Sequence, residues 1–153
     1  MTAGVIQRRG AENAENAEAP QREVTEKIIG AAIEVLRILG PGLLESVYQQ
    51  SMLVELALRC IKFDAQTPIP LVYKGQVLAA PLRLDLLVDQ AVIVEVKAVR
   101  ALEPLHSAQL LTYLRLTGLT SGLLLNFNEI TLKQGIQRVS NSLRPYAFSA
   151  PLR

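Results

Sequence analysis

Cysteine, histidine and aromatic residues are scarce in this chain of 153 residues, and each shortage excludes a kind of site. The single cysteine, Cys60, rules out a disulfide within the chain and a zinc site built from its cysteines. The single histidine, His106, excludes a His-rich metal cluster, and no motif supports a Ser/His/Asp triad. Because 50% of the residues are hydrophobic but only 5% are aromatic, we expect an aliphatic core, which suits a sheet covered by helices.

Long apolar runs and a strong excess of one charge are also missing. No segment approaches the roughly 20 apolar residues that a membrane span needs, and the first residues lack the apolar run of a signal peptide. We therefore expect a soluble, cytoplasmic protein without a membrane partner. The formal net charge of +2 is too small to identify a nucleic-acid binder, so composition leaves the partner open.

Length and local composition predict one domain between two tails. A chain of this size has room for a single domain with a hydrophobic core. Residues 1–22 are rich in Ala, Glu, Asn and Gly and have few large apolar side chains, so we expect a disordered tail there. We place the domain at 23–145 and a C-terminal tail at 146–153.

Hydrophobic spacing predicts an α/β domain with a mixed sheet. The first helix is expected to begin near Val24, with Thr25 as its cap, and to end at Gly40-Pro41. The later elements are expected, in chain order, as a helix at 44–59, a hairpin turned by Lys74-Gly75, strands at 82–88 and 92–97, a helix at 104–116, a strand at 121–126 and a helix at 132–143. The strand–helix–strand crossover implies a parallel pair within the sheet.

Three charged residues interrupt the aliphatic strands. Asp85 stands in Leu-Asp-Leu-Leu-Val, and Glu95 and Lys97 stand in Val-Ile-Val-Glu-Val-Lys. Because Glu95 and Lys97 are two residues apart, a strand directs both to one face. Buried charges need partners or a metal ion. A lone Glu-x-Lys is more often a pair of solubilising surface charges, so a site needs support from further residues.

The loop between the two strands decides whether Asp85 joins this face. Directly opposed residues of an antiparallel pair share a face. A two-residue turn at Asp89-Gln90 would oppose Asp85 to Val94 and mix the apolar and polar faces. A three-residue loop, Asp89-Gln90-Ala91, or an equivalent bulge opposes Asp85 to Glu95 and keeps the faces separate. Hydrophobic patterning therefore predicts that the two carboxylates converge.

Two predicted helices supply further candidates. Glu45 and Tyr48 are three residues apart at the start of the second helix and share a face. Taken alone, Glu45 fits a helix-dipole acid and Tyr48 a packing residue. Gln109 shares a helical face with His106 and Tyr113, and taken alone it fits a surface amide.

Converging carboxylates suggest a particular chemistry. They can hold Mg²⁺ or Mn²⁺ through oxygen ligands, with waters completing the octahedron. A bound metal ion would activate a water and neutralise charge on a phosphate oxygen. Lys97 would stabilise the developing anion or orient the water. The predicted reaction is hydrolysis of a phosphodiester.

Five short motifs occur in order between about residues 24 and 139. They are Gly42-x-x-Glu45-x-x-Tyr48, Arg83-Leu-Asp85-Leu-Leu-Val, Val94-Glu95-Val-Lys97-Ala, His106-Ser-Ala-Gln109-Leu-Leu-Thr-Tyr113-Leu and Asn126-Phe-Asn128. Together they resemble the GxxExxY family, which is assigned to the PD-(D/E)XK nuclease-like superfamily. The resemblance implies a restriction-endonuclease-like core, with a mixed four-stranded sheet flanked by helices. Leu84 stands where the superfamily's name has proline, which removes no ligand.

The resemblance also implies roles for these residues. Its catalytic set would be Glu45, Asp85, Glu95, Lys97 and Gln109, with the three carboxylates as metal ligands and with Tyr48, His106 and Tyr113 as supporting groups. The implied function is a Mg²⁺- or Mn²⁺-dependent nuclease that acts on nucleic acid, DNA more than RNA. The alternative is a non-catalytic module on the same fold that binds nucleic acid or a protein. So small a domain would gain specificity from a homodimer or a protein partner.

Overall fold

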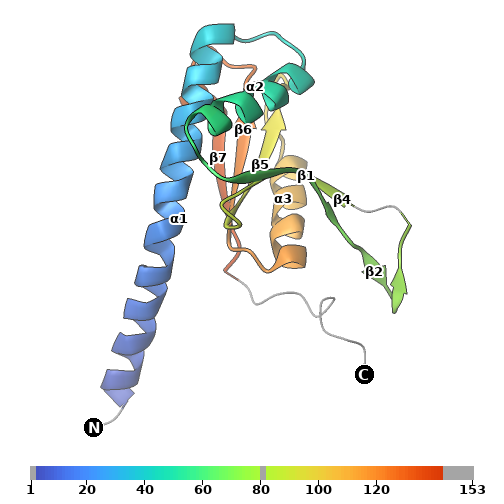
Figure 1. Ribbon diagram of the computed structural model, residues 1–153. Helices are drawn as coiled ribbons and strands as arrows, with labels where there is room; N and C mark the ends of the chain where they lie inside the picture. Colours follow the sequence, from blue (N-terminus) through green and yellow to red (C-terminus); the bar gives the residue numbers. More distant parts are fainter. Residues whose placement is uncertain (1–2, 80–81, 143–153) are drawn as a thin grey trace.

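The computed structural model of the chain describes residues 3–79 and 82–142, and side chains from residue 19 onward (Figure 1). Its elements are α1 (Ala3–Leu39), α2 (Glu45–Leu58), β1 (Phe63–Ile69), β2 (Val72–Tyr73), β3 (Gln76–Val77), β4 (Leu82–Val88), β5 (Val92–Lys97), α3 (Pro104–Thr117), β6 (Ser121–Asn126), α4 (Leu132–Gly135) and β7 (Ile136–Ser140). The main sheet has the order β1-β4-β5-β6-β7, and β2 and β3 form a separate hairpin. No helix in the described part of the chain combines the length and apolar character that crossing a bilayer requires.

The main sheet is mixed, as the crossover pattern predicts. Strands β5 and β6 are parallel and are joined through α3, whereas the other neighbouring pairs are antiparallel. The predicted α/β class is therefore confirmed, with five strands in place of the expected four. The central position of the parallel pair buries both strands on both faces, which explains their nearly unbroken apolar runs.

The additional strand corrects the prediction of a last helix at 132–143. Of the described residues in this span, 132–142, only Leu132–Gly135 is helical, and Ile136–Ser140 is the edge strand β7. In β7, half-buried Ile136 and Val139 are interspersed with exposed polar residues, a short pattern that fits either kind of element. Pairing with the backbone of β6 decides the outcome, because it satisfies an edge that would otherwise be open.

Alternating side chains of the central strands divide the core into two layers. Val92, Val94 and Val96 pack with α1 and α2 on one face of the sheet. Ile93 of β5 and Leu124 of β6 pack with α3 on the other face. Since Glu95 and Lys97 share the parity of Ile93, they belong to the α3 side of the sheet.

Helix α1 begins well before the predicted start near Val24, so that prediction is wrong. Its backbone is helical from Ala3, within the stretch where we expected a disordered tail, and Thr25 lies inside the helix as a buried residue. The apolar face that packs on the sheet begins at Val24, but the preceding Ala- and Glu-rich residues favour helix and extend it. The domain limits 23–145 stay a prediction, and the expected tail at 146–153 lies outside the described residues.

The first helix is tied to the end of the sheet as well as to its face. The guanidinium of Arg138 in β7 donates a hydrogen bond to Glu26 of α1 at 2.9 Å. Thr120 Oγ1, just before β6, donates to Gln21 Oε1 at 3.0 Å. These contacts connect the earliest and latest described elements of the domain.

Candidate active site

The β4–β5 hairpin has the register that hydrophobic patterning predicts. Its paired residues are Leu86↔Val94, Leu87↔Ile93 and Val88↔Val92. The loop is therefore the three residues Asp89-Gln90-Ala91, and Asp89 and Gln90 have positive φ values of 52° and 53°. One step further along the same register, Asp85 stands opposite Glu95. The predicted convergence of the two strands' carboxylates is confirmed at this point.

Asp85 and Glu95 form a pair of crossed hydrogen bonds, in which each carboxylate accepts from a backbone N–H of the neighbouring strand. The backbone N–H of Asp85 donates to Glu95 Oε1 at 3.3 Å. The backbone N–H of Val96 donates to Asp85 Oδ2 at 2.9 Å. Asp85 is half-buried and Glu95 is only 6% exposed. Because a backbone amide fixes one oxygen of each carboxylate, the pair has a defined orientation on the face of the sheet that α3 covers.

Strand β1 bends at the same position, a feature that the sequence analysis missed. Gln66 stands opposite Asp85 in the β1–β4 register, between the paired residues Ala65 and Thr67, but does not pair itself. Its φ of 52° lies in the left-handed region. Glutamine has no special preference for that conformation, so no sequence signal marks it. The interruption removes one residue pair of the β1–β4 ladder next to Asp85.

Burial and the neighbouring Asp85 carboxylate raise the pKa of Glu95. Burial raises the pKa of Glu95 to about 8, and repulsion from the Asp85 carboxylate adds to this effect. The ammonium of Lys97 acts in the opposite direction. In the absence of a cation, Glu95 is therefore largely protonated at neutral pH. A cation near both carboxylates would favour their ionised forms.

Helix α3 contributes a hydrogen-bonded pair to this face. Gln109 Nε2 donates to the hydroxyl oxygen of Tyr113 at 2.8 Å. Burial raises the pKa of Tyr113, and the charge of Glu95 raises it further. Tyr113 also packs in the cluster that contains Ile93 of β5, on the same face of the sheet as the acidic pair. The close approach of α3 to the sheet depends on Gly122 of β6, where an added Cβ would lie 3.0 Å from the side chain of Leu110.

The Gly42-x-x-Glu45-x-x-Tyr48 motif forms the corner between α1 and α2. Gly42 has a φ of 96°, which favours glycine. The Tyr48 hydroxyl donates to the carbonyl oxygen of Gly40 at 2.5 Å and accepts from the backbone N–H of Leu43 at 3.1 Å. Tyr48 is fully buried and so acts as an internal clamp for this corner.

The same tyrosine anchors the first turn of α2 near the end of β5. Its ring stacks on Phe127, with centroids 4.8 Å apart, and the backbone N–H of Phe127 donates to the Lys97 carbonyl at 2.8 Å. Glu45 begins α2 and accepts from Gln49 Nε2 at 3.3 Å. Within residues 3–79 and 82–142, no three acidic, histidine or cysteine side chains form a group able to hold a metal ion. The structure thus brings Asp85 and Glu95 together without Glu45, whose role as a third ligand stays a prediction.

Two other polar residues of the motifs have structural partners. His106 Nδ1 accepts from the backbone N–H of Glu103 at 2.9 Å, so the imidazole caps the start of α3. Asn126, fully buried at the end of β6, accepts from the backbone N–H of Val99 and donates to its carbonyl. Asn126 therefore fixes the loop that follows Lys97. A buried amide at the end of an apolar strand was the available signal for that role.

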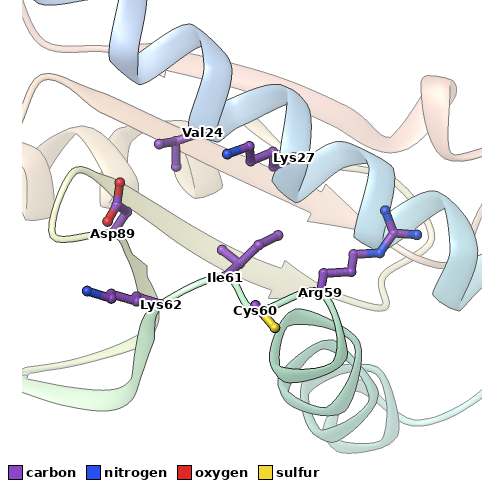
Figure 2. A pocket seen from close by; sticks show the side chains of 7 residues that line it. All are labelled: Val24, Lys27, Arg59, Cys60, Ile61, Lys62 and Asp89. Carbon is purple, nitrogen blue, oxygen red and sulfur yellow. The ribbon is translucent and has the colours of Figure 1, made fainter.

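A separate cavity of about 400 Å³ lies away from the acidic pair. Figure 2 shows its lining side chains, which come from α1, the end of α2, the segment after it and the β4–β5 loop; they are Val24, Lys27, Arg59, Cys60, Ile61, Lys62 and Asp89. None of the predicted catalytic residues lines it. The cavity therefore does not serve as the cleft of the candidate site.

The protein has the architecture of a nuclease-like α/β domain. Its mixed sheet carries Asp85 and Glu95-x-Lys97 on one face, on adjacent strands. The chain belongs to the PD-(D/E)XK nuclease superfamily, because the model of that family matches residues 22–139. The matched region contains every candidate residue named above and all of the five-stranded sheet except Ser140, the last residue of β7. Searches of the curated proteins and of the solved structures each found no match.

Proposed function

We propose that this protein is a divalent-metal-dependent nuclease of the GxxExxY type, which hydrolyses phosphodiester bonds of nucleic acid, DNA more readily than RNA. The observation that carries the proposal is the crossed pair of Asp85 and Glu95, fixed on one face of the sheet with Lys97. Burial of Glu95 beside Asp85 raises the pKa of Glu95 and destabilises the fold wherever Glu95 is ionised. Strongly perturbed acids of this kind concentrate at functional sites.

The acidic pair has the donor chemistry of a Mg²⁺ or Mn²⁺ site. Both ions prefer carboxylate oxygens, and a backbone amide orients one oxygen of each carboxylate here. The positive charge would offset the repulsion that contributes to the raised pKa of Glu95. A bound ion supplies an activated water and neutralises phosphate charge. Glu45 is proposed as the third carboxylate, delivered from the first turn of α2.

The remaining polar groups would handle the substrate. The Lys97 ammonium lies at the end of β5, where it would stabilise negative charge on the phosphate or orient the attacking water. Gln109 would contact the phosphate or the water through its exposed amide. Tyr113 would hold Gln109 in position through their hydrogen bond.

A cleavage assay with matched variants tests the proposal. Duplex DNA, single-stranded DNA and RNA would be incubated with Mg²⁺, Mn²⁺ or EDTA, using wild type, Asp85→Asn and Lys97→Met. We expect metal-dependent cleavage that falls about 100-fold or more in both variants, as when a group that stabilises the transition state is removed. Asp89→Asn is the control, because it makes the same chemical change in the nearby loop and asparagine tolerates the positive φ there. Cleavage that survives both site changes would refute the proposal.

The alternative is a binding module without catalysis, and metal titration separates the two. The alternative is favoured by the small net charge of +2. Calorimetric titration of the wild type with Mn²⁺ at pH 8.5 or above should give a heat of binding that Asp85→Asn abolishes. If the wild type binds no divalent ion, the proposal of a metal-dependent nuclease is refuted and the proposal of a binding module remains.

A further inference from the structure

We propose that the β2–β3 hairpin is an arm that grips the nucleic acid next to the candidate site; this inference rests on the proposed function. The hairpin stands apart from the five-stranded sheet and pairs only with itself among the described residues. Figure 1 shows it reaching away from the sheet, on the side of β1 and β4. It is an insertion between these two strands, and Asp85 lies on the second of them.

The tip of the arm has a defined shape. Val72 pairs with Val77 and Tyr73 pairs with Gln76, so the loop is the two residues Lys74-Gly75. Their φ values are 47° and 80°, both positive, as in the hairpin turn that matches the twist of the flanking strands. A tight turn of this kind presents neighbouring side chains in fixed directions. The arm is therefore preorganised for a partner.

The exposed side chains of the arm indicate that it contacts a binding partner. Tyr73 is 58% exposed and Val77 is 73% exposed, although both are paired residues of the hairpin. Lys74 Nζ lies 5.5 Å from the centre of the Tyr73 ring. An aromatic ring beside an ammonium group is the combination that stacks on a base and pairs with the adjacent phosphate. This chemistry favours nucleic acid over a protein partner.

The arm leaves the sheet close to the candidate site, because its root and Asp85 both lie on β4. Strands β1 and β4 are paired from Ile69↔Leu82 onward, so the root of the arm is held by the sheet. From Leu82 to Asp85 is three residues, or about 10 Å of extended strand. Arg83 is exposed between them, and strand alternation directs it to the same face as Asp85. The positively charged Arg83 thus lies between the root of the arm and the acidic pair. A two-stranded ribbon also fits the major groove of DNA, which is about 12 Å wide.

Lys74→Asn is a variant that removes the charge and preserves the fold. Asn-Gly is the preferred sequence for this turn, so the hairpin should keep its shape. Tyr73→Ser removes the ring. Lys133→Asn is the matched control, because Lys133 is an exposed lysine in α4, outside the arm. Unchanged circular dichroism and melting temperature would establish that all variants are folded.

Binding to fluorescein-labelled duplex and single-stranded DNA is measured by anisotropy in EDTA, between about 50 and 200 mM salt, so that no cleavage occurs. For Lys74→Asn we expect weaker binding and a salt-dependence slope reduced by about one. For Tyr73→Ser we expect a loss of about tenfold or more on single strands. If wild type binds and both variants match Lys133→Asn, the arm proposal is overturned and the nuclease proposal stands; a protein-binding arm gives this result. If wild type neither binds nor cleaves nucleic acid, both proposals are overturned.

Discussion

Replacing Glu95 with glutamine should stabilise the metal-free protein at alkaline pH. The folded protein holds the Glu95 proton up to about pH 8, whereas a carboxyl of ordinary pKa, 4.5, has released it long before. Between these values the folded state binds more protons than the unfolded state. The free energy of unfolding contributed by Glu95 therefore falls as the pH rises through this window. Glutamine carries no charge, and its amide oxygen can still accept from the Asp85 backbone N–H.

The size of this effect follows from the pKa difference. Each pKa unit corresponds to about 1.4 kcal/mol, so a shift from 4.5 to about 8 limits the loss to about 5 kcal/mol. Small domains have unfolding free energies of about 5–15 kcal/mol in total. The loss of stability as the pH rises from 4.5 to about 8 should consequently be a large fraction of the unfolding free energy of the wild type. Near pH 5 the two proteins should differ by about 1 kcal/mol or less, since Glu95 is then protonated in the folded wild type.

Urea unfolding followed by circular dichroism, from about pH 5 to pH 9 in EDTA, measures the effect. The control is Glu23→Gln, which changes a side chain that is 72% exposed and should retain the wild-type pH dependence. Mg²⁺ should restore stability to the wild type above pH 8 and leave Glu95→Gln unchanged. Parallel pH curves for wild type and Glu95→Gln would refute the assignment of a buried, repelled carboxyl at this position.

Three further predictions concern the frame of the site. Tyr48→Phe removes the clamp on Gly40 and should lower the free energy of unfolding by about 1–2 kcal/mol in urea titrations; an unchanged midpoint would contradict this role. Gly135→Ala places a Cβ 2.1 Å from the Asn126 carbonyl oxygen and should cost about 3 kcal/mol or more, visible as a clear drop in melting temperature. Gly122→Ala meets only flexible side-chain atoms at 3.0 Å, so its melting temperature should fall less; the reverse order would show that the backbone at Gly135 yields.

Local patterning was enough to predict the centre of the site. In β4 and β5, alternation of apolar and polar residues limited the loop to an odd length, which puts Asp85 and Glu95 on one face. The three-residue loop then places them opposite each other. The partner of each carboxylate oxygen was beyond prediction, because the crossed bonds to backbone amides depend on where the ladder between the strands opens. The same limit applies to Gln66, because glutamine gives no indication of the positive φ that it adopts here.

Features set by distant contacts were harder to predict. Residues 136–140 carry a weak pattern of their own and become a strand because β6 offers an unpaired edge. The motif around Tyr48 was noticed for its spacing, but its clamp on the α1–α2 corner depends on a loop folded by Gly42. The sequence could likewise place Glu45 at the start of a helix, but not its distance from the acidic pair.

The contacts between α1 and the end of the sheet have a consequence during synthesis of the chain. Among the described elements, α1 is translated first, and β7, which carries the partner of Glu26, is translated last. The buried face of α1, including Ile28 and Ala32, therefore has no sheet to cover it until the later strands emerge from the ribosome. Folding of the domain must therefore wait until β7 has been translated, and the uncovered face of α1 is the segment that a chaperone would need to shield.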